Sequence, residues 1–153
     1  MLIDEEILMI LLENKDKVEF VLEDRDNPDF YNDFLKEAHS LGIFLFIDYK
    51  GEEGNEIVNF IIDYEETHNI ELATEDELEE LGEYEYDFFP DKIKAANACL
   101  FPKGYGLFVL PSFSDFYILF ISRLENKEKL TGTELFDDES IPPGERCIQY
   151  FYE

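Results

Sequence analysis

Residues 43–47 read Ile-Phe-Leu-Phe-Ile, a run that offers no polar face to water. It is too short for a typical helix and rich in β-prone side chains, so it favours a buried strand. Gly42 stands directly before it, where glycine commonly ends a helix in the left-handed conformation. The polar stretch from Lys50 to Gly54 follows as a turn. We therefore predict a strand between two helices.

Apolar side chains recur at helical spacing on both sides of this strand. Upstream, the pattern predicts a helix over residues 3–12, a second short helix over 18–22 and a third over 30–41. Asn27-Pro28-Asp29 interrupts the helical pattern before the third helix. Downstream, isoleucine and valine within residues 57–62 predict the next helix.

The second half of the chain carries clear helix and hairpin signals. Thr74, followed three residues later by Glu77, forms a capping box ahead of a short helix, and a further helix is expected over 91–100. Two apolar, β-prone runs at 107–110 and 116–121 are separated by five residues, which predicts a hairpin. These two strands should pair.

A short helix over 124–130 and a last strand over 147–152 complete the predicted elements. The expected fold class is α+β: a mixed or mainly antiparallel sheet of four to five strands packed by helices, in a single domain over residues 1–153. Three strands are apolar on both faces, so we place them centrally with helices or a partner covering both sides. Five side chains should be largely buried there: Phe44, Phe46, Val109, Ile118 and Phe120.

Acidic residues are concentrated in one part of the chain. The formal net charge is -26, yet 45% of the residues are hydrophobic, which is typical of a folded domain. Residues 1–90 contain 28 acids and 5 bases, whereas residues 91–153 contain 10 acids and 7 bases. No lysine or arginine lies between Lys50 and Lys92, so we call residues 51–91 the acidic segment.

The composition opposes several classes of function. Direct nucleic-acid binding needs a basic surface, which this chain lacks. No apolar run approaches the ~20 residues of a membrane-spanning helix, and residues 1–12 lack a basic signal-peptide start, which favours a cytoplasmic protein without membrane contact. Cys99 and Cys147 lack metal-ligand spacing and favour two reduced thiols, although the sequence leaves a disulfide open.

No motif identifies a catalytic or cofactor site. His39 and His68 are the only imidazoles, and each fits a surface or helix-capping role. With 38 acids in the chain, some carboxylates fall at catalytic distance by chance, so paired acids single out nothing. The aspartates within residues 24–29 lack the glycine and the glutamate of a calcium loop. We therefore predict no cofactor and no dedicated metal site.

Aromatic side chains alternate with acids within the acidic segment, and this pattern predicts a binding surface. Exposed rings can anchor a contact while carboxylates steer a basic partner. The alternative is that residues 84–88 form a half-buried strand and residues 75–80 a solvated helix face, and the sequence leaves both open. The candidate partner-binding residues are Asp63, Tyr64, Glu79, Glu80, Glu83, Tyr84, Glu85, Tyr86, Asp87 and Phe88.

The stretch from Ile43 to Glu53, followed by Glu56-Ile57-Val58, resembles the opening of a small bacterial α+β domain family of unknown function. The hairpin over residues 107–121 fits the same layout. This resemblance implies a fold and no catalytic residues. In size and acidity the chain is also similar to immunity proteins that neutralise bacterial nuclease toxins.

The sequence therefore favours an acidic binding protein that recognises a positively charged protein partner, in the manner of toxin-neutralising immunity proteins or nucleic-acid mimics. The first alternative is a small hydrolase that uses carboxylates or a metal ion. The second is a structural or scaffold domain whose acidity serves only solubility.

Overall fold

In the computed structural model of the chain, the predicted strand forms as β1 (Leu45–Asp48). The helix before it, α3 (Phe30–Ser40), ends in a turn at Gly42, whose φ of 76° favours glycine. The Ile43 N–H donates to the Ala38 carbonyl and closes this turn. The structure describes residues 5–13, 15–23, 26, 30–111, 116–132, 134–135, 139–140, 142 and 145–152.

The predicted helices form close to their expected positions. The other elements of the described residues are α1 (Glu5–Leu12), α2 (Lys15–Glu23), α4 (Glu56–His68), α5 (Glu75–Glu83), α6 (Pro90–Leu100), the short helix η1 (Phe101–Lys103), β2 (Tyr105–Leu110), β3 (Phe116–Arg123), the short helix η2 (Leu124–Asn126), α7 (Lys127–Gly132) and β4 (Gln149–Tyr150). None of the described helices has the length and apolar composition that crossing a membrane requires. The predicted break at residues 27–29 and positions 112–115 of the hairpin loop lie outside the described residues.

Among the described residues, four strands form one antiparallel sheet in the order β1-β3-β2-β4. The predicted hairpin pairs β2 with β3 and sets Val109 opposite Leu119. β1 adds to the other side of β3, with Leu45 opposite Leu119. β4 pairs with β2 through Tyr150 and Phe108. The α+β class and the four-stranded sheet packed by helices are confirmed.

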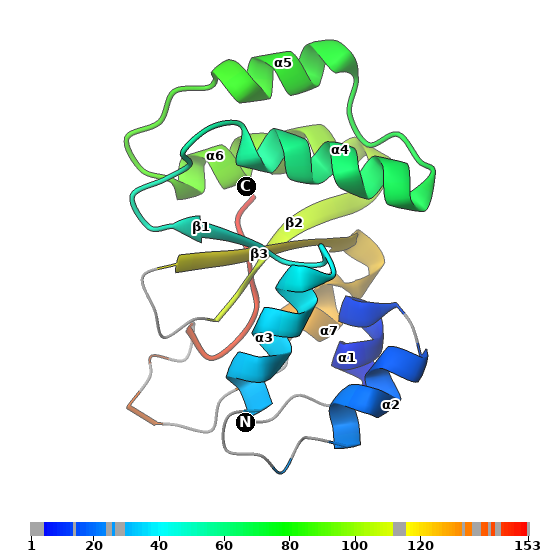
Figure 1. Cartoon of the computed structure of the whole chain (residues 1–153). Coiled ribbons are helices and arrows are strands. Elements are labelled where there is room, and N and C mark those ends of the chain that lie inside the picture. The colour runs from blue at the N-terminus through cyan, green and yellow to red at the C-terminus, as the bar shows by residue number, and fades with distance from the viewer. Residues whose placement is uncertain are drawn as a thin grey trace.

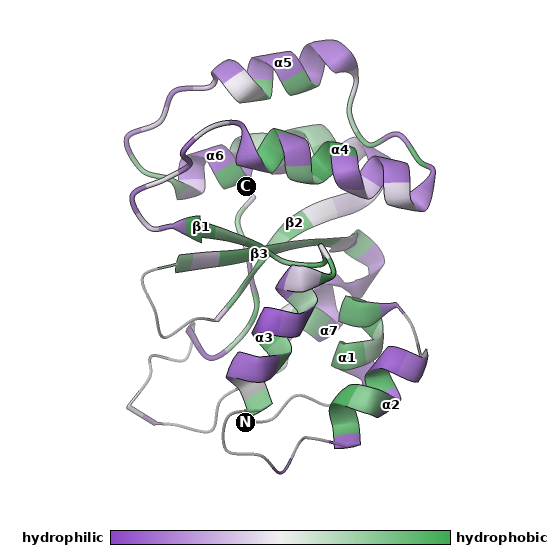
Figure 2. Cartoon of the chain, in the orientation of Figure 1, coloured by the Kyte–Doolittle hydropathy of each residue, from purple (hydrophilic) through white to green (hydrophobic). Residues whose placement is uncertain are grey.

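Helices cover both faces of this sheet, as Figure 1 shows. α4, α5 and α6 lie on one face, whereas α1, α2, α3 and α7 lie on the other. Alternate residues of β3 serve the two layers, because Leu119 and Ile121 face the first layer while Ile118 and Phe120 face the second. In Figure 2 the strands between the layers are mostly apolar, and α5 is largely hydrophilic.

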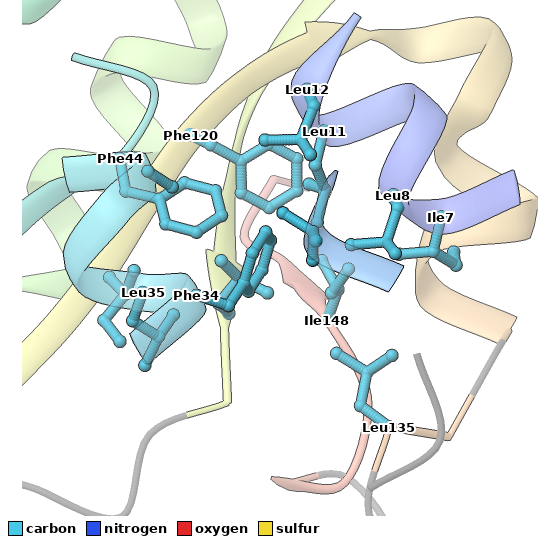
Figure 3. Packing of buried hydrophobic residues seen from close by; sticks show 14 of the residues in the cluster. Ile7, Leu8, Leu11, Leu12, Phe34, Leu35, Phe44, Phe120, Leu135 and Ile148 are labelled. Atoms are coloured by element: carbon cyan, nitrogen blue, oxygen red, sulfur yellow. The ribbon is translucent and has the colours of Figure 1, made fainter. Parts of the chain in front are cut away.

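The core on the α1–α3 side is built from large apolar side chains (Figure 3). The ring of Phe44 meets Phe34 edge to face at 5.6 Å between centroids and lies 6.0 Å from Phe120. Leu8 from α1 and Ile148 beside β4 close the same cluster. Removing these surfaces from water supplies most of the free energy that holds the helices to the sheet.

On the α4–α6 side, one buried amide joins helix to sheet. Asn97 of α6 is fully buried, and its Nδ2 donates to the carbonyls of Leu107 at 3.2 Å and Phe151 at 2.9 Å. Its Oδ1 accepts the Leu107 N–H at 2.6 Å. Asn97 therefore satisfies the backbone where the pairing of β2 with β4 stops, and it fastens the C-terminal segment to α6.

One prediction about the sheet is wrong, because β1 is an edge strand rather than a central one. This edge strand is apolar along its length because helices cover both of its faces, and Ile47 is buried on the α4–α6 side. Phe46 is half-buried rather than buried, since it lies at this edge against His39 and Phe116. The other four predicted core residues are buried.

Candidate functional site

The acidic segment includes α5, which forms an outer layer against α4 and α6 (Figure 1). The predicted capping box begins this helix: the Glu77 N–H donates to Thr74 Oγ1 at 3.1 Å, and the Thr74 N–H donates to Glu77 Oε1 at 3.0 Å. The acids in its first turn also interact favourably with the helix dipole. Leu81 is the one buried residue of α5, with Leu78 half-buried beside it. The helix therefore turns most of its acids to solvent.

The segment after α5 alternates buried and exposed aromatic rings without forming a strand. Phe89 is buried and Tyr86 is half-buried, and their rings meet edge to face at 5.6 Å between centroids. Tyr84 and Phe88 are 41% and 63% exposed. The alternative prediction of a strand over 84–88 is wrong, since this fully described stretch has no strand pairing.

A buried ion pair lies beside this segment and fixes it to the start of α4. Lys92 Nζ is 2.5 Å from Glu52 Oε1, and both side chains are 3% exposed. The second carboxylate oxygen of Glu52 accepts the Ile57 N–H at 2.8 Å, in the first turn of α4. Each charge needs the other, because a buried charge without a partner costs about 3–5 kcal/mol.

Tyr86 completes this arrangement, which we call the Glu52–Lys92–Tyr86 network. The tyrosine hydroxyl accepts the Glu52 N–H at 2.9 Å, and Lys92 Nζ lies 5.8 Å from the ring centroid. The same hydroxyl lies 2.6 Å from the position that a Cβ would take at Gly51, whose φ is 119°. Only glycine fits at that position. Tyr86 thus has a structural role and is not an exposed anchor.

The predicted acids around this segment are exposed to solvent. They are Asp63 on α4 and Glu79, Glu80, Glu83, Glu85 and Asp87 on or after α5. Among the described residues, one ion pair joins a lysine or arginine to the acidic segment. It is the pair between Lys92 and Glu52, which is buried inside the protein. The outer charge therefore remains uncompensated. We call residues 75–91, with their exposed acids and rings, the acidic face.

Tyr64, the remaining predicted residue, packs against the start of β2 instead of joining the acidic face. Its ring stacks on His68 at 3.8 Å between centroids and meets Tyr105 edge to face at 6.1 Å. Burial raises the pKa of Tyr64, and the negative charge of Glu13 raises it further. The contacts of Tyr64 are those of a packing residue.

His68 links the two helical layers through a contact that the sequence did not reveal. Its Nε2 lies 2.6 Å from Glu13 Oε2, and its Nδ1 lies 3.0 Å from the Tyr64 carbonyl oxygen. Both ring nitrogens therefore face oxygen atoms. Glu13 follows α1 with a φ of 55°, which is uncommon for a residue other than glycine. His68 ends its helix as predicted, but its partner lies 55 residues away.

A second surface that sequence reasoning missed is an apolar groove of about 430 Å³ between α2 and α3. Among its lining residues, Phe20 and Leu41 are 62% and 46% exposed, whereas Val21 and Phe34 are buried. The sequence shows only that Phe20 lies on a predicted helix, and sequence alone does not distinguish an exposed phenylalanine from a core residue. The groove lies on the opposite side of the sheet from the acidic face (Figure 1).

Carboxylates also gather at the turn between α4 and α5, around a shallow groove of about 690 Å³. Glu65 is engaged there, because its Oε2 accepts the N–H groups of Leu72 at 2.6 Å and Ala73 at 3.3 Å. Within the described part of the chain, no group of three or more His, Cys, Asp or Glu side chains could hold a metal ion. Asp24 and Asp29, two of the aspartates considered above for a calcium loop, lie outside that part.

Cys99 and Cys147 are free cysteines in the structure. Burial raises the pKa of Cys99, and the charges of Glu77 and Glu80 on α5 raise it further. Burial also raises the pKa of Cys147, with Glu134 adding to the effect. The thiol of Cys99 on α6 therefore lies within the negative electrostatic field of the acidic face.

Two tyrosines make a matched pair that tests the Glu52–Lys92–Tyr86 network. Tyr86→Phe removes the acceptor of the Glu52 N–H and should lower the free energy of unfolding by about 1–3 kcal/mol. The buried hydroxyl of Tyr150 makes no hydrogen bond among the described residues, so Tyr150→Phe should leave stability unchanged or raise it. Urea unfolding measures both. Equal losses would contradict the role given to Tyr86.

The field of the acidic face should appear in the titration of Cys99. In a Cys147→Ser background, the rate of alkylation at Cys99 should rise with pH only above the ordinary thiol range, because the raised pKa keeps the thiol protonated. Glu80→Gln should shift that profile to lower pH, and the matched control Glu79→Gln should shift it less. Identical profiles for the two variants would show that Cys99 does not sense Glu80.

Comparison with known proteins gives a family and no function. A family model described as Domain of unknown function (DUF6630) matches residues 4–134, which is most of the chain. Neither the curated proteins nor the solved structures include a match to the chain. The matched residues include α1 to α7, the acidic face and both partners of the buried ion pair. The chain therefore belongs to the DUF6630 family of domains.

Proposed function

We propose that the chain is an acidic binding protein whose acidic face recognises a basic region of a protein partner. The observation that carries this proposal is the exposure of Phe88 and Tyr84, at 63% and 41%, among acids that have no cation partner in the described residues. Aromatic rings are typical anchors at the centre of an interface. Uncompensated carboxylates around them accelerate the approach of a basic partner and select against acidic ones.

The surroundings of the acidic face support binding without a large ordering cost. The capping box fixes the start of α5, and the Glu52–Lys92–Tyr86 network fixes the segment between α5 and α6. A surface that is already ordered loses little conformational entropy when a partner binds. The backbone that carries the exposed rings is therefore held in place by the buried residues beside it.

The narrower form of the proposal concerns the class of partner. A basic protein that itself binds nucleic acid would meet the acids of α5 and its flanks as it meets a phosphate backbone. Neutralisation of a nuclease toxin by an immunity protein and mimicry of nucleic acid share this chemistry. The size and acidity of the chain support both.

Charge reversal on the acidic face should abolish capture of such a partner. The test variant carries lysine at Glu79, Glu80, Glu83 and Glu85, and the matched control carries lysine at Glu5, Glu19, Glu23 and Glu128 on the other layer. The wild type and the control should capture one basic protein from the native cell extract, and the test variant should not. Because the charges steer association and are screened over about 8 Å at physiological salt, the association rate should fall steeply as salt rises.

A partner that the test variant captures as well as the wild type does, or one whose association rate is independent of salt, would overturn the proposal. Circular dichroism of the two reversed variants establishes that both are folded. Their equal change in net charge separates the position of the charge from its amount.

Phe88 should act as an anchor that slows dissociation. Phe88→Ala removes an exposed ring from the acidic face and should raise the dissociation rate of the captured partner about 10-fold or more. Phe20→Ala is the matched control, because Phe20 is 62% exposed and lies on the opposite side of the sheet. Surface plasmon resonance gives both rates. An equal effect of the two substitutions would show that Phe88 is not a specific contact.

A further inference from the structure

A cleft of about 560 Å³ lies at the edge of the acidic face, between the end of α5, the surface of α6 and the C-terminal segment. Tyr84, the residue that caps the C-terminus of α5, and Tyr152, which follows β4, both line it. Ala95 and Ala98 of α6 line it as well, and their short side chains leave the space open. Two aromatic rings from distant parts of the sequence thus meet around one hollow.

The tyrosine from the C-terminal segment is held in place before any ligand binds. The ring of Tyr152 stacks on Phe101 at 5.1 Å between centroids and lies 6.2 Å from Tyr150. The carbonyl of the preceding Phe151 accepts a hydrogen bond from the buried Asn97 at 2.9 Å. A ring that is already fixed loses little entropy when a ligand stacks on it.

The charges of the cleft favour a cation. Asp91 and Lys94 both line it, and neither makes an ion pair among the described residues. The two charges offset each other, so the neighbouring acids of the acidic face set the sign of the local potential. Negative potential and aromatic rings together attract a cation and repel an anion.

We infer that this cleft is the subsite for an arginine side chain of the basic partner, a conclusion that rests on the proposed function. The guanidinium group is planar, stacks on aromatic rings and donates several hydrogen bonds in a fixed geometry. It can therefore contact Tyr84 and Tyr152 with its faces while it donates to the carboxylate of Asp91. A lysine ammonium has no planar face to stack and is more strongly hydrated.

The test compares terminally blocked nona-arginine and nona-lysine peptides, which carry equal charge. The acidic face alone attracts both peptides, whereas the cleft adds affinity for arginine. Fluorescence titration of the wild type should give a dissociation constant about 3- to 10-fold lower for nona-arginine. Tyr84→Ala and Tyr152→Ala should each remove most of this preference, because they weaken the binding of nona-arginine more than that of nona-lysine.

The conservative variants Tyr84→Phe and Tyr152→Phe keep an aromatic ring and should retain the preference for arginine. Tyr49→Ala removes a tyrosine that is 55% exposed outside the cleft and should also retain it. Equal affinities of the wild type for the two peptides, or a preference that survives both alanine variants, would overturn the arginine subsite while leaving the acidic face in place. Failure of the wild type to bind either peptide would overturn the proposed function itself.

Discussion

The buried ion pair between Lys92 and Glu52 is the interaction on which the arrangement of the acidic face depends. It joins the first turn of α6 to the loop that precedes α4, and both charges are withdrawn from water. Such a pair does little for net stability compared with an apolar contact, but it penalises every arrangement in which one charge is left alone. It therefore specifies where the segment between α5 and α6 lies.

The rest of the acidic face follows from that fixed position. Tyr86 contacts both members of the pair, and Phe89 packs against Tyr86 in the core. With these two rings directed inward, the residues between and before them remain exposed. Lys92, which directly follows the acidic segment, pairs with Glu52 inside the protein, so it does not neutralise the acids outside. A net charge of -26 opposes folding through self-repulsion, and two well-packed cores on either side of the sheet offset this cost.

The elements of the fold could be predicted from local patterns, because helical periodicity, the capping box at Thr74 and the apolar runs of the hairpin act over a few residues. The position of β1 could not, since an apolar run reports that both faces are covered and does not report the order of strands. The Glu52–Lys92 and Glu13–His68 contacts join residues 40 and 55 positions apart, and composition carries no signal for such pairs. Gly51 is required by the nearby Tyr86 hydroxyl, yet in the sequence it reads only as part of a turn.

We propose that the chain binds basic partners on the α4–α6 side of its sheet, and amide chemical shifts measured by NMR locate such a contact residue by residue. During titration with the nona-arginine peptide, the shift changes should concentrate in residues 75–91 and at Tyr152. Amides of α1, α2 and α3 on the other face should remain unchanged. Changes centred on the apolar groove between α2 and α3, with the acidic face unaffected, would contradict it.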